Sequence, residues 1–232
     1  MANKEITFYT HPSTFGNGYF PESPPYDRIA GLMIDGETLW AKPSILAEEN
    51  NYQRTDTEAL TLTLPGPLAH TTADYFRDFY ADPPHFYTVS NPFAERAAQS
   101  NCHRFGTTVW TNRPQGIHEA TNIASQIISK NQRLSDAAPP LGQLVAFGTI
   151  EAENNLWDIR DRLSYHTQLS LGPDRYLQVM TFAGNMGLSH SLEETSAFYR
   201  GKHPPIEVFQ SVGVEPLPAD AQAVDVLRRA FG

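Results

Sequence analysis

The chain has one cysteine among its 232 residues, Cys102, and few basic side chains, with 17 Lys and Arg against 26 Asp and Glu. A single cysteine cannot close an intramolecular disulfide, so we expect a fold that does not depend on an oxidising compartment. The net charge is −9, and no run of Lys and Arg is longer than the pair at 228–229. Both features argue against a nucleic-acid partner, which needs a clustered positive surface.

Long apolar runs are also missing, and none approaches the roughly 18 residues that a membrane-spanning helix needs. The first residues, MANKEITFYTHPS, show neither the apolar region nor the cleavage site of a Sec signal peptide. We therefore expect a cytoplasmic protein, or one exported without a cleavable Sec signal. Because paired cysteines and the HExxH motif are absent, we expect neither a metal nor another cofactor.

The periodicities that are present predict an α+β fold, with strands and helices in mixed order. The pair Asp35-Gly36 between two alternating segments predicts a hairpin turn, and Ser191 with Glu194 predicts a helix start as a capping box. We predict strands over residues 5–9, 28–33, 38–41, 61–64, 143–147, 165–171, 175–180 and 206–212. We predict helices over residues 71–80, from Cys102 to before Pro114, and over 116–130, 191–200 and 220–231.

Cys102 lies in the segment SNCHRF, where a loop pattern gives way to a helical one with Phe105 and Val109 on one face. A thiol at a helix N-terminus lies near the positive end of the helix dipole, which favours the reactive thiolate. The unpaired N–H groups of that turn can also bind a developing oxyanion. Since a free cysteine is more often a small buried hydrophobe, this position needs a matching base to indicate function.

Three later segments supply a matching pattern. Residues 140–148 read PLGQLVAFG, residues 165–172 read YHTQLSLG and residues 175–178 read RYLQ. After a cysteine that opens a helix, this order resembles the NlpC-type and CHAP-type members of the papain-like cysteine peptidase superfamily. In those families a strand that begins with the catalytic histidine is followed by a strand that carries a polar third residue.

The resemblance implies that Cys102 is a nucleophile, His166 its base and Gln178 the residue that orients the imidazole. The twelve residues from His166 to Gln178 fit two paired strands whose side chains both face the cysteine. The chemistry needs these residue types, because a thiol requires a base with a pKa near the working pH. The second ring nitrogen requires an acceptor, which an amide oxygen can supply.

Residues near this pattern extend or modify it. Tyr87 matches the tyrosine upstream of the nucleophile whose hydroxyl helps to bind the oxyanion in NlpC-type enzymes. Asn101 and His103 are candidates to line the cleft, and at these positions the chain is closer to the lecithin retinol acyltransferase-like and PPPDE-like relatives. In those relatives histidine precedes cysteine, and under that order His11 or His70 would be the base. We expect His11 to open a Pro-containing loop and His70 to cap a strand end.

The resemblance implies a papain-like core over residues 86–215, with a Cys-bearing helix packed on an antiparallel sheet. A β-rich N-terminal extension (1–85) and a C-terminal helix (216–232) complete the expected organisation. The implied function is a cysteine hydrolase that cleaves amide bonds through an acyl-thioester, with peptidoglycan stem peptides as substrate. The alternatives are a thiol acyltransferase, deamidase or isopeptidase acting on a cytoplasmic protein, and a papain-like binding module without activity. The sequence does not indicate the oligomeric state.

Overall fold

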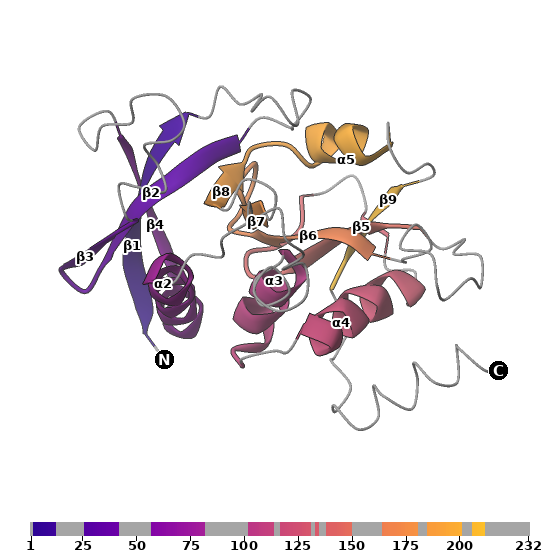
Figure 1. Ribbon diagram of the computed structural model, residues 1–232, viewed down its shortest axis with the longest axis horizontal. Helices are drawn as coiled ribbons and strands as arrows, with labels where there is room; N and C mark the ends of the chain where they lie inside the picture. Colours follow the sequence, from indigo (N-terminus) through magenta and orange to yellow (C-terminus); the bar gives the residue numbers. More distant parts are fainter. Residues whose placement is uncertain are drawn as a thin grey trace, which may run out of the picture.

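A computed structural model describes residues 2–12, 26–41, 57–81, 102–113, 117–130, 133–134, 138–149, 164–180, 185–200 and 206–211. Strands in these residues form one antiparallel sheet with the order β4-β1-β2-β8-β7-β6-β5-β9, and β3 pairs with β2 outside this path (Figure 1). Helices cover the sheet on both faces. The predicted α+β class is therefore confirmed at this level, with an antiparallel sheet at its centre.

Strands and helices follow one another in irregular order along the chain, as is typical of α+β folds. The strands are β1 (Asn3–Pro12), β2 (Tyr26–Ile34), β3 (Glu37–Trp40), β4 (Glu58–Pro65), β5 (Leu144–Gly148), β6 (Ser164–Ser170), β7 (Tyr176–Met180), β8 (Asn185–Ser189) and β9 (Glu207–Gln210). The helices are α2 (Gly66–Ala81), α3 (Cys102–Thr111), α4 (Ile117–Ser129) and α5 (Leu192–Arg200).

The N-terminal strands follow the predicted hairpin closely. Asp35 and Gly36 connect β2 to β3 with φ angles of 51° and 80°, the left-handed conformation that a two-residue hairpin turn requires. Helix α2 begins at Gly66, earlier than the predicted residue 71. The reason is that Pro67 lies in the first turn, where its missing N–H costs no helical hydrogen bond.

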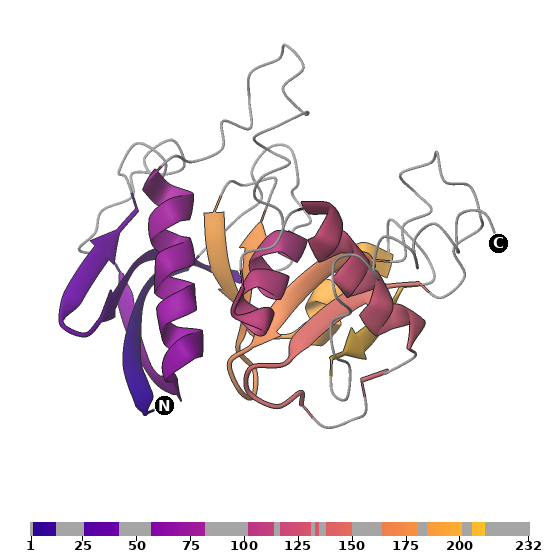
Figure 2. The same cartoon turned by 90° about the horizontal axis from the view of Figure 1, so that it is seen from below.

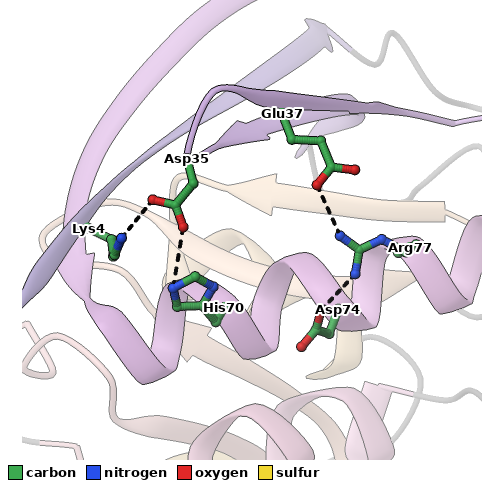
Figure 3. Close-up of polar contacts among 6 residues, drawn as sticks. All are labelled: Lys4, Asp35, Glu37, His70, Asp74 and Arg77. Atoms are coloured by element: carbon green, nitrogen blue, oxygen red, sulfur yellow. Dashed lines mark hydrogen bonds and ion pairs between the residues drawn. The ribbon is translucent and has the colours of Figure 1, made fainter. Parts of the chain in front are cut away.

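Exposed ion pairs connect this hairpin to its surroundings (Figure 3). The Nζ of Lys4 on β1 lies 2.7 Å from Asp35 Oδ1, and Arg77 on α2 lies 3.6 Å from Glu37 on β3. His70, also on α2, lies 3.6 Å from the other carboxylate oxygen of Asp35. These side chains are more than a third exposed, so the contacts orient the hairpin and add little to stability.

The largest apolar cluster lies between the N-terminal strands and helices α2 and α3. It includes Phe8 from β1, Phe76 from α2 and Phe105 from α3, all fully buried. The ring of Tyr75 on α2 packs edge-on against Phe105, with 4.9 Å between ring centroids. Figure 2 shows α2, α3 and α4 side by side over one face of the sheet.

Side chains of β5 show which helices cover each face. Leu144 and Ala146 pack with the buried isoleucines of α4, whereas Val145 and Phe147 pack with Leu192 and its neighbours on α5. Since successive strand residues point to opposite faces, α5 covers the face opposite to α3 and α4. The same separation is visible in Figure 1, where α5 lies above strands β5–β7 and helices α3 and α4 lie below them.

Strand β8, which the sequence did not predict, joins the two halves of the sheet. It pairs with β7 along its length and with β2 at residues 26–28. Gly187 permits this contact, because a Cβ at that position would lie 2.3 Å from the Tyr26 ring. The segment NMGLS contains a glycine and no β-branched or aromatic residue, so it carries little strand signal. The strands before residue 85 thus belong to the same sheet as β5–β9.

Other predicted elements within the described residues are present, with ends that differ by a few residues. The N-cap bond of the predicted capping box is confirmed, since the N–H of Glu194 donates to Ser191 Oγ at 3.1 Å. The predicted C-terminal helix over 216–232 lies outside the described residues.

Candidate active site

Cys102 is the first residue of α3, as predicted, and its side chain is 8% exposed. The first turn of α3 contains no acidic residue of its own. The partial positive charge of the helix N-terminus is therefore not offset within that turn, which favours the thiolate.

Helix α3 approaches the sheet closely beside Cys102. The Thr167 hydroxyl on β6 donates to the backbone carbonyl of Cys102 at 2.8 Å. Gly106, one turn later, allows this approach, because a Cβ there would lie 2.6 Å from Leu144 Cδ1 and 3.2 Å from Thr167 Oγ1. The start of α3 therefore lies against the part of β6 that also carries His166.

His166 and Gln178 form a buried pair. His166 Nε2 lies 2.7 Å from Gln178 Oε1, with the two side chains 2% and 0% exposed. Strands β6 and β7 pair at Leu169–Leu177 and Ser170–Tyr176. Beyond these pairs, hydrogen bonds from His166 and Gln168 on β6 to Gln178 on β7 link the two strands. The predicted relation between His166 and Gln178 is thus present as a hydrogen bond.

The imidazole of His166 lies on the face of the sheet that α5 covers. Its ring stacks on Tyr199 of α5, with centroids 5.3 Å apart and planes inclined by 26°. Phe147, its partner on β5, lies on the same side. Thr167 points the opposite way, toward Cys102, because side chains alternate along β6. Adjacent residues of β6 thus make different contacts: Thr167 binds the backbone of Cys102, and the His166 ring stacks on Tyr199. The expectation that the side chains of His166 and Gln178 face the cysteine stays a prediction.

Burial dominates the protonation of His166. It lowers the pKa of the imidazole from its ordinary 6.5 to about 4, although the hydrogen bond with Gln178 acts in the opposite direction. The ring is therefore neutral near pH 7. A neutral imidazole has one nitrogen with a free lone pair and can accept a proton, but its pKa of about 4 lies below the value near the working pH that was expected of the base.

Tyr199 of α5 is influenced by both His166 and Cys102. Burial raises the pKa of its hydroxyl well above 10, and the negative charge of a Cys102 thiolate raises it further. The hydroxyl consequently stays protonated at all physiological pH values. The ring of Tyr199 thus contacts His166, and the pKa of its hydroxyl depends on the charge of Cys102.

The other predicted site residues have different outcomes. His103 is a buried residue in the first turn of α3. Tyr87 and Asn101 lie outside the described residues, so their predicted roles in oxyanion binding and in the cleft stay predictions.

The two alternative bases, His11 and His70, lie in β1 and α2. His11 lies within β1, opposite Arg28, rather than opening a loop. His70 lies within α2 and faces Asp35, so the expectation that it caps a strand end was wrong (Figure 3). The error arose because α2 begins before the apolar periodicity becomes visible. His190, a further histidine, lies 2.7 Å from Asp27 and links β8 to β2.

Sequence reasoning missed three neighbours of this pair, namely Gln168, Thr195 and Tyr199. Gln168 stands two residues after His166, and the period of a strand indicates that both lie on one face. The sequence could therefore have predicted that Gln168 lies near His166. Thr195 and Tyr199 belong to α5, and no local pattern shows which face of the sheet that helix covers.

Comparisons of this chain with protein-family models, with curated proteins and with solved structures find no match. None of the helices that the structure describes is long and apolar enough to cross a membrane. The described ranges contain no group of three or more His, Cys, Asp or Glu side chains arranged to hold a metal ion.

Proposed function

We propose that this protein is a papain-like thiol hydrolase that cleaves amide bonds, with Cys102 as nucleophile, His166 as base and Gln178 as the orienting residue. The observation that carries the proposal is the buried hydrogen bond between His166 Nε2 and Gln178 Oε1 at 2.7 Å. A carboxamide that accepts from one ring nitrogen leaves the other nitrogen to act as the base. Thr167, the residue after His166, donates to the backbone carbonyl of the cysteine that begins α3.

The burial of these groups also supports the proposal. Leu169, Leu177 and Val179 fill the α3 face of the same strands with apolar side chains, whereas His166 and Gln178 are polar and equally buried. Burying polar groups costs free energy even when they are hydrogen-bonded, so such clusters are common at functional sites. A purely structural sheet would carry apolar residues at both positions.

The proposed reaction has two stages. In the first, Cys102 transfers its thiol proton to His166 and the sulfur attacks the amide carbonyl carbon. The C–N bond then breaks, and His166 returns the proton to the leaving amine. In the second, His166 takes a proton from water, whose oxygen attacks the thioester carbonyl carbon. The C–S bond then breaks, the carboxylic acid leaves, and His166 returns the proton to the Cys102 sulfur. In this proposal the N–H groups at the start of α3 stabilise the negative oxygen in both stages.

The substrate class comes from the family resemblance, which suggests the stem peptides of peptidoglycan. The same Cys–His–Gln arrangement also serves a thiol acyltransferase, a deamidase or an isopeptidase. These alternatives differ in the group that receives the acyl chain or in the amide that is cleaved. A binding module without activity is the alternative from a different class.

The test is digestion of purified peptidoglycan by the wild-type protein and matched variants, with mass spectrometry of the soluble products. The wild type is expected to release fragments with new amine and carboxylate ends. Cys102→Ala should abolish release, and His166→Gln should lower the rate by roughly a hundredfold or more, the usual contribution of a general base. His70→Gln is the control, since this exposed side chain on α2 faces Asp35.

A second measurement separates the alternatives. Thiol alkylation at Cys102 is followed against pH in the wild type and in His166→Gln, and acyl adducts are sought by mass spectrometry of the intact protein. Full digestion by Cys102→Ala would refute the assignment of the nucleophile. An acyl adduct at Cys102 without release from peptidoglycan would favour an acyltransferase or isopeptidase. Identical alkylation profiles for wild type and His166→Gln would favour the binding module.

A further inference from the structure

A chain of four hydrogen bonds runs from the backbone of α5 to the His166 imidazole. The Thr195 hydroxyl donates to the backbone carbonyl of Ser191 at 3.1 Å. Gln168 Nε2 donates to Thr195 Oγ1 at 3.3 Å and to Gln178 Oε1 at 2.7 Å. Gln178 Oε1 in turn lies 2.7 Å from His166 Nε2. The side chains of Gln168, Gln178 and Thr195 are fully buried.

The first bond determines the direction of the others. A backbone carbonyl can only accept, so the hydroxyl proton of Thr195 is used at Ser191 and its oxygen accepts from Gln168. The atom of Gln168 that faces Thr195 must therefore be the NH₂ group. Its second proton points at Gln178, so the atom of Gln178 at that place must be the carbonyl oxygen.

This direction decides which nitrogen of His166 carries the proton. An amide oxygen accepts, so His166 Nε2 must be the N–H and Nδ1 keeps its lone pair. The two ends of a carboxamide have nearly the same shape, and a rotated Gln178 would present its NH₂ group to the ring. That rotation would require the opposite tautomer, in which Nδ1 carries the proton and cannot act as a base.

Of these four hydrogen bonds, the reversed network would keep three. With both amides rotated, the Thr195 hydroxyl would have to donate to Gln168 and would give up its bond to the Ser191 carbonyl. In the observed network, Gln168 Oε1 and Gln178 Nε2 are buried without a hydrogen-bond partner among the described residues.

We infer that Gln168 and Thr195 are positioning residues that hold His166 in the Nε2–H tautomer and so leave Nδ1 free to accept a proton. The tautomer itself does not depend on the reaction. Its use in taking the Cys102 proton rests on the proposed function.

The test is ¹⁵N NMR of histidine-labelled protein at neutral pH, where the His166 ring is neutral, with its signals assigned by their loss in His166→Gln. The wild type is expected to show a protonated Nε2 and an unprotonated Nδ1. Thr195→Val, which keeps the shape and removes the hydroxyl, should shift His166 toward a mixture of tautomers. One hydrogen bond typically changes such a ratio about five- to tenfold. Thr195→Ser should restore the wild-type spectrum, and Gln168→Leu should produce the largest shift.

Ser196→Ala is the matched control. Ser196 follows Thr195 in α5 and is equally buried, and its hydroxyl has no hydrogen-bond partner among the described residues. Its loss should leave the His166 signals unchanged, and circular dichroism should show that each variant is folded. A wild-type ring protonated at Nδ1, or a Thr195→Val spectrum identical to wild type, would overturn the inference. Failure of the proposed function is a separate result: no digestion by any variant, with the tautomer shifting as expected.

Discussion

The two halves of this sheet place their polar contacts differently. Around α2 and the β2–β3 hairpin, charged side chains such as Lys4, Glu37 and Arg77 lie at the surface, and the interior is mainly apolar. Beneath α5, an apolar cluster adjoins a buried polar one, in which His166 and Gln178 are hydrogen-bonded. The first arrangement is the one that stability alone selects. The second costs free energy of desolvation, and the proposed chemistry explains why it is kept.

The largest effect is expected in the apolar half. Phe76→Ala removes a ring that is fully buried between α2 and the sheet and that packs on Tyr80 with 4.6 Å between centroids. The free energy of unfolding should fall by about 3–5 kcal/mol, from lost burial and the cavity left behind. Denaturant titration measures this, with Phe76→Leu as the smaller change. A loss below about 1 kcal/mol would show that this core is loosely packed and would remove the contrast.

A somewhat smaller effect is expected in the polar half, and it depends on pH. The folded pKa of His166 is about 4, below its ordinary 6.5, so between these values the unfolded chain binds more protons. The stability contribution is complete above about pH 6.5 and is lost as pH falls toward 4. The loss should be on the order of 3 kcal/mol.

This loss is measured as the difference in pH dependence of unfolding between the wild type and His166→Gln, from pH 4 to 7. The variant should lack that part of the slope, whereas His70→Gln should retain it, because His166 is intact. Equal slopes in the wild type and His166→Gln would mean that the imidazole is not buried in solution. The titratable side chains would then be exposed in both halves of the sheet.

The smallest effect is expected for the surface pairs. Arg77→Gln removes contacts with Asp74 at 2.7 Å and Glu37 at 3.6 Å, but the Arg77 side chain is 45% exposed. The free energy of unfolding should change by no more than about 0.5 kcal/mol, and less at high salt. Thermal melts at low and high ionic strength check this. A loss of several kcal/mol would show that the hairpin depends on its charges after all.

Much of the candidate site follows from local patterns. The helix that begins at Cys102, the strand that carries His166 and the strand that carries Gln178 were all predicted, and the structure confirms these elements. The hydrogen bond between His166 and Gln178 followed from their spacing on neighbouring strands. Strand β8 was missed because its composition has little strand propensity and only its neighbours β2 and β7 stabilise it.

The sequence by itself determined the features that depend on short-range sterics and hydrogen bonds. These are the Asp35-Gly36 turn, the Ser191 cap and the alternation that places His166, Gln168 and Gln178 on one face. Only the tertiary structure decided which helix covers that face. It brought Tyr199 to the imidazole and Thr195 to Gln168 from a different part of the chain, and it brought the backbone of Cys102 to Thr167 on β6. Contacts of this kind arise from packing between distant segments, and no local periodicity encodes them.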